Sequence, residues 1–136
     1  MLSEKTRDYL LDILDAITHI NQTVRGRSVE DYLGSRDLQA IVERNLITIG
    51  EVLARLRDSD PETIDRITSH SEAIGLRNII IHEYRRLDDR IVWRTVWEFL
   101  PIMDAECRML IGESSPSMSG EDEPYVGDGG GAWPSR

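Results

Sequence analysis

Cysteine is almost absent from this chain of 136 residues, in which Cys107 is the single thiol. One thiol cannot form an intramolecular disulfide, and it cannot supply the several thiolates of a cysteine-based zinc site. A chain without disulfides is compatible with the reducing cytoplasm, where we expect this protein to be located. We place Cys107 in the core, near the end of the last helix.

Long hydrophobic runs are also missing. No stretch approaches the roughly 18 consecutive apolar residues that a membrane-spanning helix needs. The first 14 residues, MLSEKTRDYLLDIL, place acidic residues among the leucines and offer no cleavage site of small residues, so they are not typical of a signal peptide. We therefore expect no membrane association.

Alternation of apolar and polar residues, the mark of β-strands, is not sustained anywhere. Residues that are almost all apolar instead recur every three or four positions, which is the helical pattern, in two long stripes: Leu10, Ile13, Ile17, Ile20 and Val24, then Leu38, Ile41, Asn45, Ile49, Val52 and Leu56, with Val42, Leu46 and Leu53 beside the second. Ser3 and Ser35 suit the helix starts, and Gly26 suits a helix end. The pattern predicts an all-α fold, an antiparallel helical bundle of four to five helices with up-down connections.

Three further boundaries are predicted in the second half of the chain. Asp60 followed by Pro61 is typical of a helix start, because aspartate caps the first turn and proline fits the first helical position. A helix from about Ser71 should run through residues 77–84, and the last long helix should start at Asp88 or Asp89. Pro101 lies inside that last helix, so it should kink it or shift its boundary.

The composition changes at Gly112. Residues 112–136 are rich in Gly, Ser, Pro and acidic residues. Such a segment buries too little apolar surface to offset the entropy lost on ordering. We expect a helical domain over residues 1–111 and a disordered C-terminal tail over residues 112–136.

The net charge of −9 disfavours nonspecific binding of nucleic acid, a polyanion. The distribution of charge still allows local basic patches. Fifteen of the sixteen basic residues are arginine, with Lys5 as the exception. Arginine is suited to bidentate contact with phosphate, although many chains are simply rich in it.

The most apolar segment, Ile79 to Ile81, is flanked by side chains that need hydrogen-bond partners: Arg77, Asn78, His82 and Tyr84. One interpretation is structural, with Asn78 and His82 four residues apart on one helix face and able to bond each other. The other is catalytic. A histidine can transfer protons near neutral pH, and a guanidinium can hold a phosphate and stabilise charge that develops on it.

These two groups suit the cleavage of RNA without a metal ion. The 2′-hydroxyl attacks phosphorus, a base takes its proton, and an acid protonates the leaving 5′-oxygen. One histidine per motif leaves one proton carrier missing, which a dimer with facing motifs would supply. Arg77 and His82 are separated by about 140° around a helix. The arginine could curl back, the helix could end near His82, or a second subunit could complete the site.

The segment RNIIIHEY resembles the R-x-x-x-x-H-x-Y signature of HepT toxins, a branch of the HEPN superfamily. The flanking GLRNIIIHEY and DDRIVWRTVWEFLP, together with YLLDILDAI and DLQAIVERNLITIGE, are also similar to that family. The resemblance covers roughly residues 3–111. It implies a dimeric, HEPN-like helical bundle in which Arg77 and His82 form the ribonuclease pair at the dimer cleft, and Asn78 is the polar residue that follows the arginine.

The resemblance also implies a partner. HepT toxins are neutralised by a minimal nucleotidyltransferase, MntA, which can transfer AMP from ATP onto the motif tyrosine, here Tyr84. Added AMP would place negative charge and bulk beside the RNA site. We thus expect an RNA-cleaving toxin of a toxin–antitoxin pair that needs no metal and no cofactor. Arg85 and Arg86 are possible RNA phosphate contacts or ordinary surface ion pairs. The alternatives are a noncatalytic dimer that binds a nucleotidyltransferase or nucleotides as a scaffold, and a purely structural helical dimer.

Overall fold

The computed structural model of the protein describes residues 2–113, which are helical with short connections and contain no β-strand. The long helices are α1 (Glu4–Val24), α3 (Arg36–Ser59), α5 (His70–His82) and α7 (Leu100–Glu113), and the last continues directly from α6 (Asp89–Arg94) and the π-helical turn η2 (Thr95–Phe99). The shorter elements are α2 (Val29–Leu33), α4 (Pro61–Ile64) and the 3-10 turn η1 (Tyr84–Arg86). The predicted all-α class is confirmed, with four long helical stretches.

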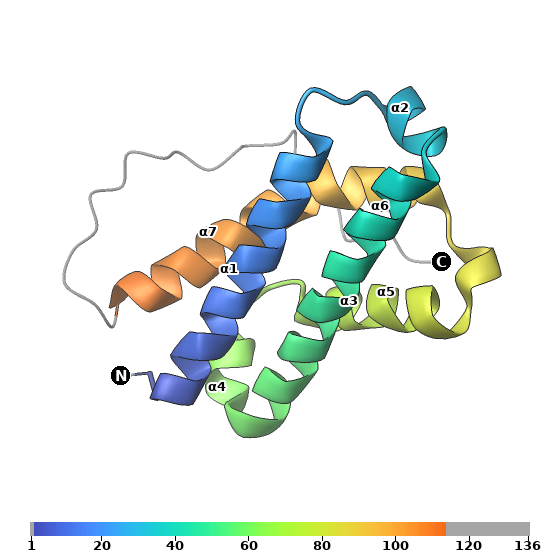
Figure 1. The fold of residues 1–136 in the computed structure, drawn as a ribbon. Helices are drawn as coiled ribbons and strands as arrows, with labels where there is room; N and C mark the ends of the chain where they lie inside the picture. The colour runs from blue at the N-terminus through green and yellow to red at the C-terminus, as the bar shows by residue number, and fades with distance from the viewer. Residues whose placement is uncertain (1, 114–136) are drawn as a thin grey trace.

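Helices α1 and α3 lie side by side and run in opposite directions, as Figure 1 shows. Helix α7 packs on α1, α5 packs on α3, and α2 packs on both α3 and α6. The core between them holds the predicted stripe of α1 and the second half of the predicted stripe of α3, and Cys107 is fully buried, as predicted. At the start of α3 the prediction was wrong for Ile41, which is 38% exposed, because Val42 and Leu46 face the core there instead. Within residues 2–113, no helix is both long enough and apolar enough to cross a membrane.

The predicted helix starts are confirmed by side-chain caps. The hydroxyl oxygens of Ser3 and Ser35 accept hydrogen bonds from the backbone N–H groups of Thr6 and Leu38. Asp60 caps α4, and its carboxylate also accepts a hydrogen bond of 2.9 Å from the Thr6 hydroxyl of α1. This carboxylate therefore ties the start of the first helix to the α3–α4 corner.

Helix α5 takes the earlier of the two ends that the sequence left open. It stops at His82, and Glu83 leaves the helical conformation with φ −132° and ψ 40°. The N–H of Arg86 donates to the Glu83 carbonyl at 2.8 Å, and the N–H of Leu87 donates to the Tyr84 carbonyl at 3.0 Å, which closes a tight turn before α6. Because α6 begins so soon after α5, the chain must reverse at once, and Tyr84 lies in η1 instead of on the helix.

Pro101 is accommodated by a widened turn. Proline has no N–H to donate to the carbonyl four residues earlier, and its ring would clash with that carbonyl in a regular helix. In the preceding turn, η2, the N–H of Leu100 donates to the carbonyl of Thr95, five residues back. This π-helical turn makes room for the ring, so the helix continues through Pro101.

Of the predicted tail, the structure describes Gly112 and Glu113, which continue α7. The expectation of disorder for the remainder, residues 114–136, lies outside the described residues. The division at residue 111 stays a prediction.

Candidate functional site

Arg77 lies on the side of α5 that packs against α3, directly over Gly50. A Cβ atom placed on Gly50 would lie 2.4 Å from the Cβ atom and 2.8 Å from the Cγ atom of Arg77. No side chain larger than hydrogen fits at Gly50 without moving the arginine or separating the helices. Glycine at this position therefore lets the stem of Arg77 lie flat on α3.

The guanidinium of Arg77 is held by neighbours on both helices. Its Nη1 donates a 3.0 Å hydrogen bond to the side-chain oxygen of Asn78, and its Nη2 lies 3.7 Å from a carboxylate oxygen of Glu51 on α3. Its Nε is shielded from solvent and has no hydrogen-bond partner among the described residues. The side chain is 27% exposed, so a fixed positive charge remains reachable from solvent.

His82 is the last residue of α5, and its side chain is exposed. Its imidazole forms no hydrogen bond and no ion pair with any residue in the range 2–113. The predicted bond between Asn78 and His82 is absent from that range, because the Asn78 oxygen accepts from Arg77 instead. Arg77 faces α3 while His82 faces solvent. The two side chains of one chain therefore do not contact each other, although both project from α5.

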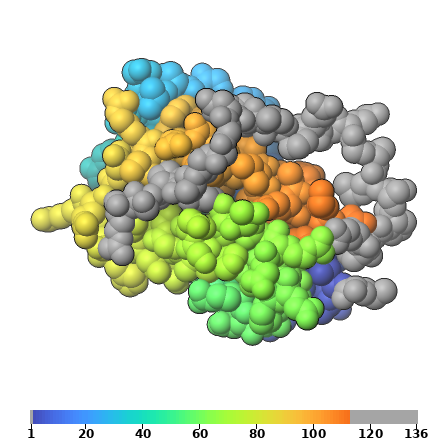
Figure 2. Space-filling model, turned by 180° about the vertical axis from the view of Figure 1, so that it is seen from behind, coloured from blue at the N-terminus to red at the C-terminus, as the bar shows by residue number. Residues whose placement is uncertain are grey.

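The turn η1 presents the remaining motif residues. The α5–α6 connection forms a projection at one edge of the molecule in Figure 1 and again in Figure 2, where it is yellow. Tyr84 is 56% exposed on this turn, and Arg85 is exposed as well. Arg86 lies 3.0 Å from the carboxylate of Glu83, which is the kind of surface ion pair that the sequence left open. The turn thus offers an accessible phenol and an arginine, Arg85, that forms no ion pair with any of the residues described.

Sequence reasoning missed two residues of this site, Gly50 and Glu51. A glycine inside an otherwise apolar helical pattern signals that another backbone or side chain comes close. That signal was present in the sequence, but it does not say which side chain comes close. Glu51 gave no signal, because a lone acidic residue on a helix is usually solvated.

A family model described as "Ribonuclease HepT-like" matches residues 13–110, a range that contains the whole 77–84 segment. The chain belongs to this HepT-like family. A protein named "Probable ribonuclease HepT" from Thermococcus cleftensis is 32% identical over 104 residues, which cover 76% of this chain and 94% of that protein.

Two further relatives extend the comparison. A "Putative RNase" of Caldanaerobacter subterraneus is 29% identical over 105 residues, covering 77% of this chain and 93% of the relative. Another "Putative RNase", of Methanocaldococcus jannaschii, is 24% identical over 110 residues, covering 81% of this chain and all of the relative. No solved structure shows a significant match to this HepT-like chain.

A group of acidic and phenolic side chains lies beside the start of α6. Glu43 of α3 is only 8% exposed, and one of its carboxylate oxygens is buried without a hydrogen-bond partner in the described part of the chain. Burial, together with the charge of Asp89, raises the pKa of Glu43 to about 7. Tyr32 of α2 is fully buried against Trp93, and burial and the charge of Glu43 raise the pKa of its hydroxyl. This HepT-like protein thus keeps, near Asp89 at the start of α6, a buried carboxyl group that is easily protonated.

The packing of Arg77 on Gly50 predicts opposite effects for two glycine-to-alanine changes. Gly50→Ala should lower the free energy of unfolding by about 1–3 kcal/mol, because the added methyl group overlaps the Arg77 stem. Gly75→Ala is the matched control, since nothing lies within 4 Å of its added Cβ. It should raise the free energy of unfolding by up to about 1 kcal/mol through helix propensity. Urea denaturation measures both, and equal stability of the two variants would contradict the close approach.

The raised pKa of Glu43 predicts a stability that falls with rising pH. The folded protein holds the proton more tightly than the unfolded chain, so stability is lost as pH rises from about 4.5 to above 7. At pH 8, Glu43→Gln should be more stable than wild type by about 1–3 kcal/mol, with little difference at pH 4. Asp12→Asn, an exposed change on α1, should leave the pH dependence as it is. Parallel pH profiles for wild type and Glu43→Gln in urea denaturation would refute the assignment.

Proposed function

We propose that this HepT-like chain is an endoribonuclease that cuts RNA without a metal ion and serves as the toxin of a toxin–antitoxin pair in the cytoplasm. The observation that supports the proposal is that the second half of α5 presents both an imidazole and a guanidinium. His82 is exposed and unbonded within residues 2–113, and Arg77 is a half-buried guanidinium fixed one turn earlier. The names of the relatives as ribonucleases support the same class of reaction.

The chemistry assigns one role to each group. The 2′-oxygen of a ribose attacks the adjacent phosphorus and loses its proton to a base, while the bond to the 5′-oxygen breaks and that oxygen takes up a proton from an acid. The products are a 2′,3′-cyclic phosphate and a free 5′-hydroxyl. His82 transfers the protons, and Arg77 stabilises the negative charge that builds up on the phosphate oxygens. Asn78 supports Arg77 by accepting its Nη1–H.

A homodimer supplies what one chain lacks. Arg77 and His82 project from α5 in directions about 140° apart, and in the proposed dimer the second proton carrier is the His82 of the other protomer. The apolar side chain of Ile81, inside the motif, is exposed and suits a contact between two copies. Two facing motifs would then combine Arg77 of each protomer with His82 of its partner. Arg85 and Arg86 at the rim would contact the RNA phosphates on either side.

Neutralisation is assigned to a cognate MntA-type nucleotidyltransferase. Tyr84 lies on an exposed turn, where a modifying enzyme can reach its hydroxyl. Transfer of AMP from ATP forms a bond between that oxygen and the α-phosphorus and releases pyrophosphate. The added phosphate repels RNA, and the added nucleoside blocks entry to the site.

A noncatalytic scaffold is the second candidate, and one observation favours it. Arg77 is already engaged with Asn78 and Glu51, as expected for an arginine that mainly holds α5 on α3. In that case the motif would maintain the fold while the surface binds a nucleotidyltransferase or nucleotides. The activity of His82 variants separates the two candidates, since the His82 side chain makes no hydrogen bond or ion pair within residues 2–113 that the fold would lose.

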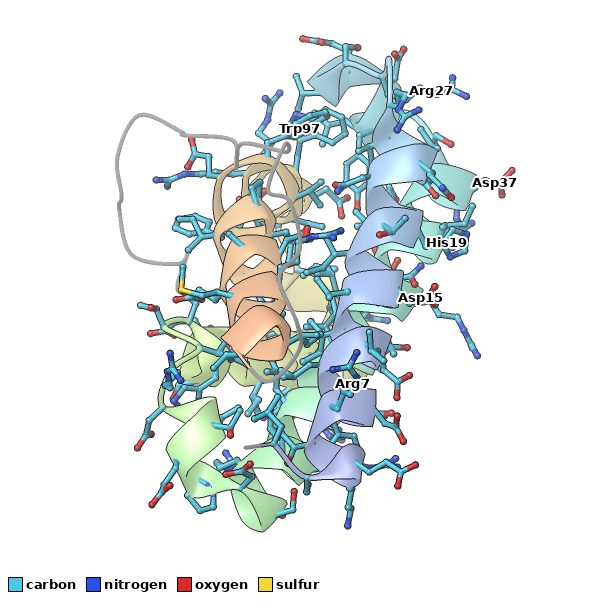
Figure 3. All side chains as sticks on the ribbon, turned by 90° about the vertical axis from the view of Figure 1, so that its left-hand side faces the viewer. Arg7, Asp15, His19, Arg27, Asp37 and Trp97 are labelled. Atoms are coloured by element: carbon cyan, nitrogen blue, oxygen red, sulfur yellow. The ribbon has the colours of Figure 1, made fainter. Side chains whose placement is uncertain are left out.

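Purified wild-type protein should cut RNA in the presence of a chelator, and His82→Ala should lower the rate by about 10²–10⁴-fold through loss of proton transfer. His19→Ala is the control. Its side chain is exposed on α1, as Figure 3 shows, and it should keep wild-type activity. Gel analysis of cleaved RNA gives the rate, and circular dichroism checks the fold. Wild-type protein that binds nucleotides but cuts no RNA would favour the scaffold.

Incubation with the cognate transferase and ATP should raise the intact mass of the protein by one or more AMP units. Tyr84→Phe should abolish this gain because it removes the acceptor oxygen. Tyr9→Phe, a half-buried position on α1, should keep it. A mass gain that persists in Tyr84→Phe would show that the acceptor lies elsewhere.

A further inference from the structure

We infer that Glu51 is a positioning residue for Arg77, holding its guanidinium in place and competing with the RNA phosphate for it. The inference rests on the proposed function, because the group being positioned is the proposed phosphate ligand. Glu51 follows Gly50 on α3, so one short segment provides both the surface on which the Arg77 stem lies and the charge that its tip faces.

The three guanidinium nitrogens have different surroundings. Nη1 donates one of its two N–H groups to Asn78, and Nε is shielded from solvent. Nη2 is left for an incoming phosphate, and it is the nitrogen that faces Glu51. A phosphate that makes a two-point contact with the terminal nitrogens of Arg77 therefore includes Nη2, the nitrogen with a carboxylate beside it.

The separation between Nη2 and the Glu51 carboxylate fits a contact that can be displaced. At 3.7 Å the pair is too far apart for a hydrogen bond, so charge attraction alone acts between them. The Glu51 side chain is 44% exposed, so water can solvate its carboxylate when a phosphate takes its place. A phosphate accepts hydrogen bonds from a guanidinium at shorter range, which favours the exchange.

Loss of the Glu51 charge should therefore affect binding and turnover in opposite directions. RNA should bind more tightly, because the competing carboxylate is gone. Cleavage should slow, because a guanidinium without its partner samples more orientations and no longer meets the developing charge as well. A purely structural role for Glu51 would not tighten RNA binding.

The experiment measures both quantities on the full-length protein. Binding of a 2′-O-methyl RNA oligonucleotide, which lacks the attacking hydroxyl, is followed by fluorescence anisotropy at fixed salt. Turnover is measured with the matching cleavable RNA. Glu51→Gln should bind about three- to tenfold more tightly and turn over about tenfold more slowly. Glu51→Asp, which keeps the charge, should stay within about twofold of wild type in binding.

Two controls isolate the interaction. Asp15→Asn removes the same unit of charge from an exposed position on α1, visible in Figure 3, and should change binding by less than about twofold. In an Arg77→Ala background, Glu51→Gln should no longer tighten binding, because the group for which it competes is absent.

The outcomes separate the inference from the proposed function. If wild type cuts RNA but Glu51→Gln binds no more tightly, or tightens equally without Arg77, the role of Glu51 is overturned and the ribonuclease assignment stands. If wild type binds RNA without cutting it, the ribonuclease assignment fails, and the binding series still decides whether Glu51 competes for Arg77. Wild-type protein that neither binds nor cuts overturns both.

Discussion

The close approach of α5 to α3 at Gly50 is the constraint on which the rest of the site depends. Because a glycine at that point allows the Arg77 stem to lie on α3, the arginine reaches Glu51 and Asn78 and keeps its charged tip at the surface. The same contact fixes the rotation of α5. His82, five residues later, then faces solvent at the end of the helix, and the turn that follows exposes Tyr84.

The helices themselves could be predicted from the sequence because their signals are local. Apolar spacing identified the buried faces of α1 and α3, and the serine and aspartate caps marked their starts, since both depend on residues three or four apart. The end of α5 stayed open between Tyr84 and His82 because neither glycine nor proline marks it, and the structure has it at His82. That end depends on the short connection to α6, whose backbone hydrogen bonds form only once both helices are in place.

Contacts between helices could not be predicted from the sequence either, because they too depend on how two separate elements are placed in the fold. Pro101 predicted an irregularity in the last helix. Whether the helix kinks or one of its turns widens depends on the packing around residues 95–99. Glu43 looked like any surface acid, yet the fold buries it beside Tyr32 and within range of Asp89. The residues of the motif were identifiable, whereas the residues that hold them, Gly50 and Glu51, became visible only in three dimensions.

The central claim, that Arg77 of one protomer works with His82 of its partner, is tested most directly by mixing two inactive variants. Arg77→Ala and His82→Ala are combined in equal amounts, and co-purification of differently tagged chains shows that mixed dimers form. Each mixed dimer holds one intact Arg77–His82 pairing but only one of the two histidines, so the mixture should recover a part of wild-type RNA cleavage, up to about a quarter, while each parent alone stays inactive. A mixture with confirmed mixed dimers that stays as inactive as either parent would contradict the account.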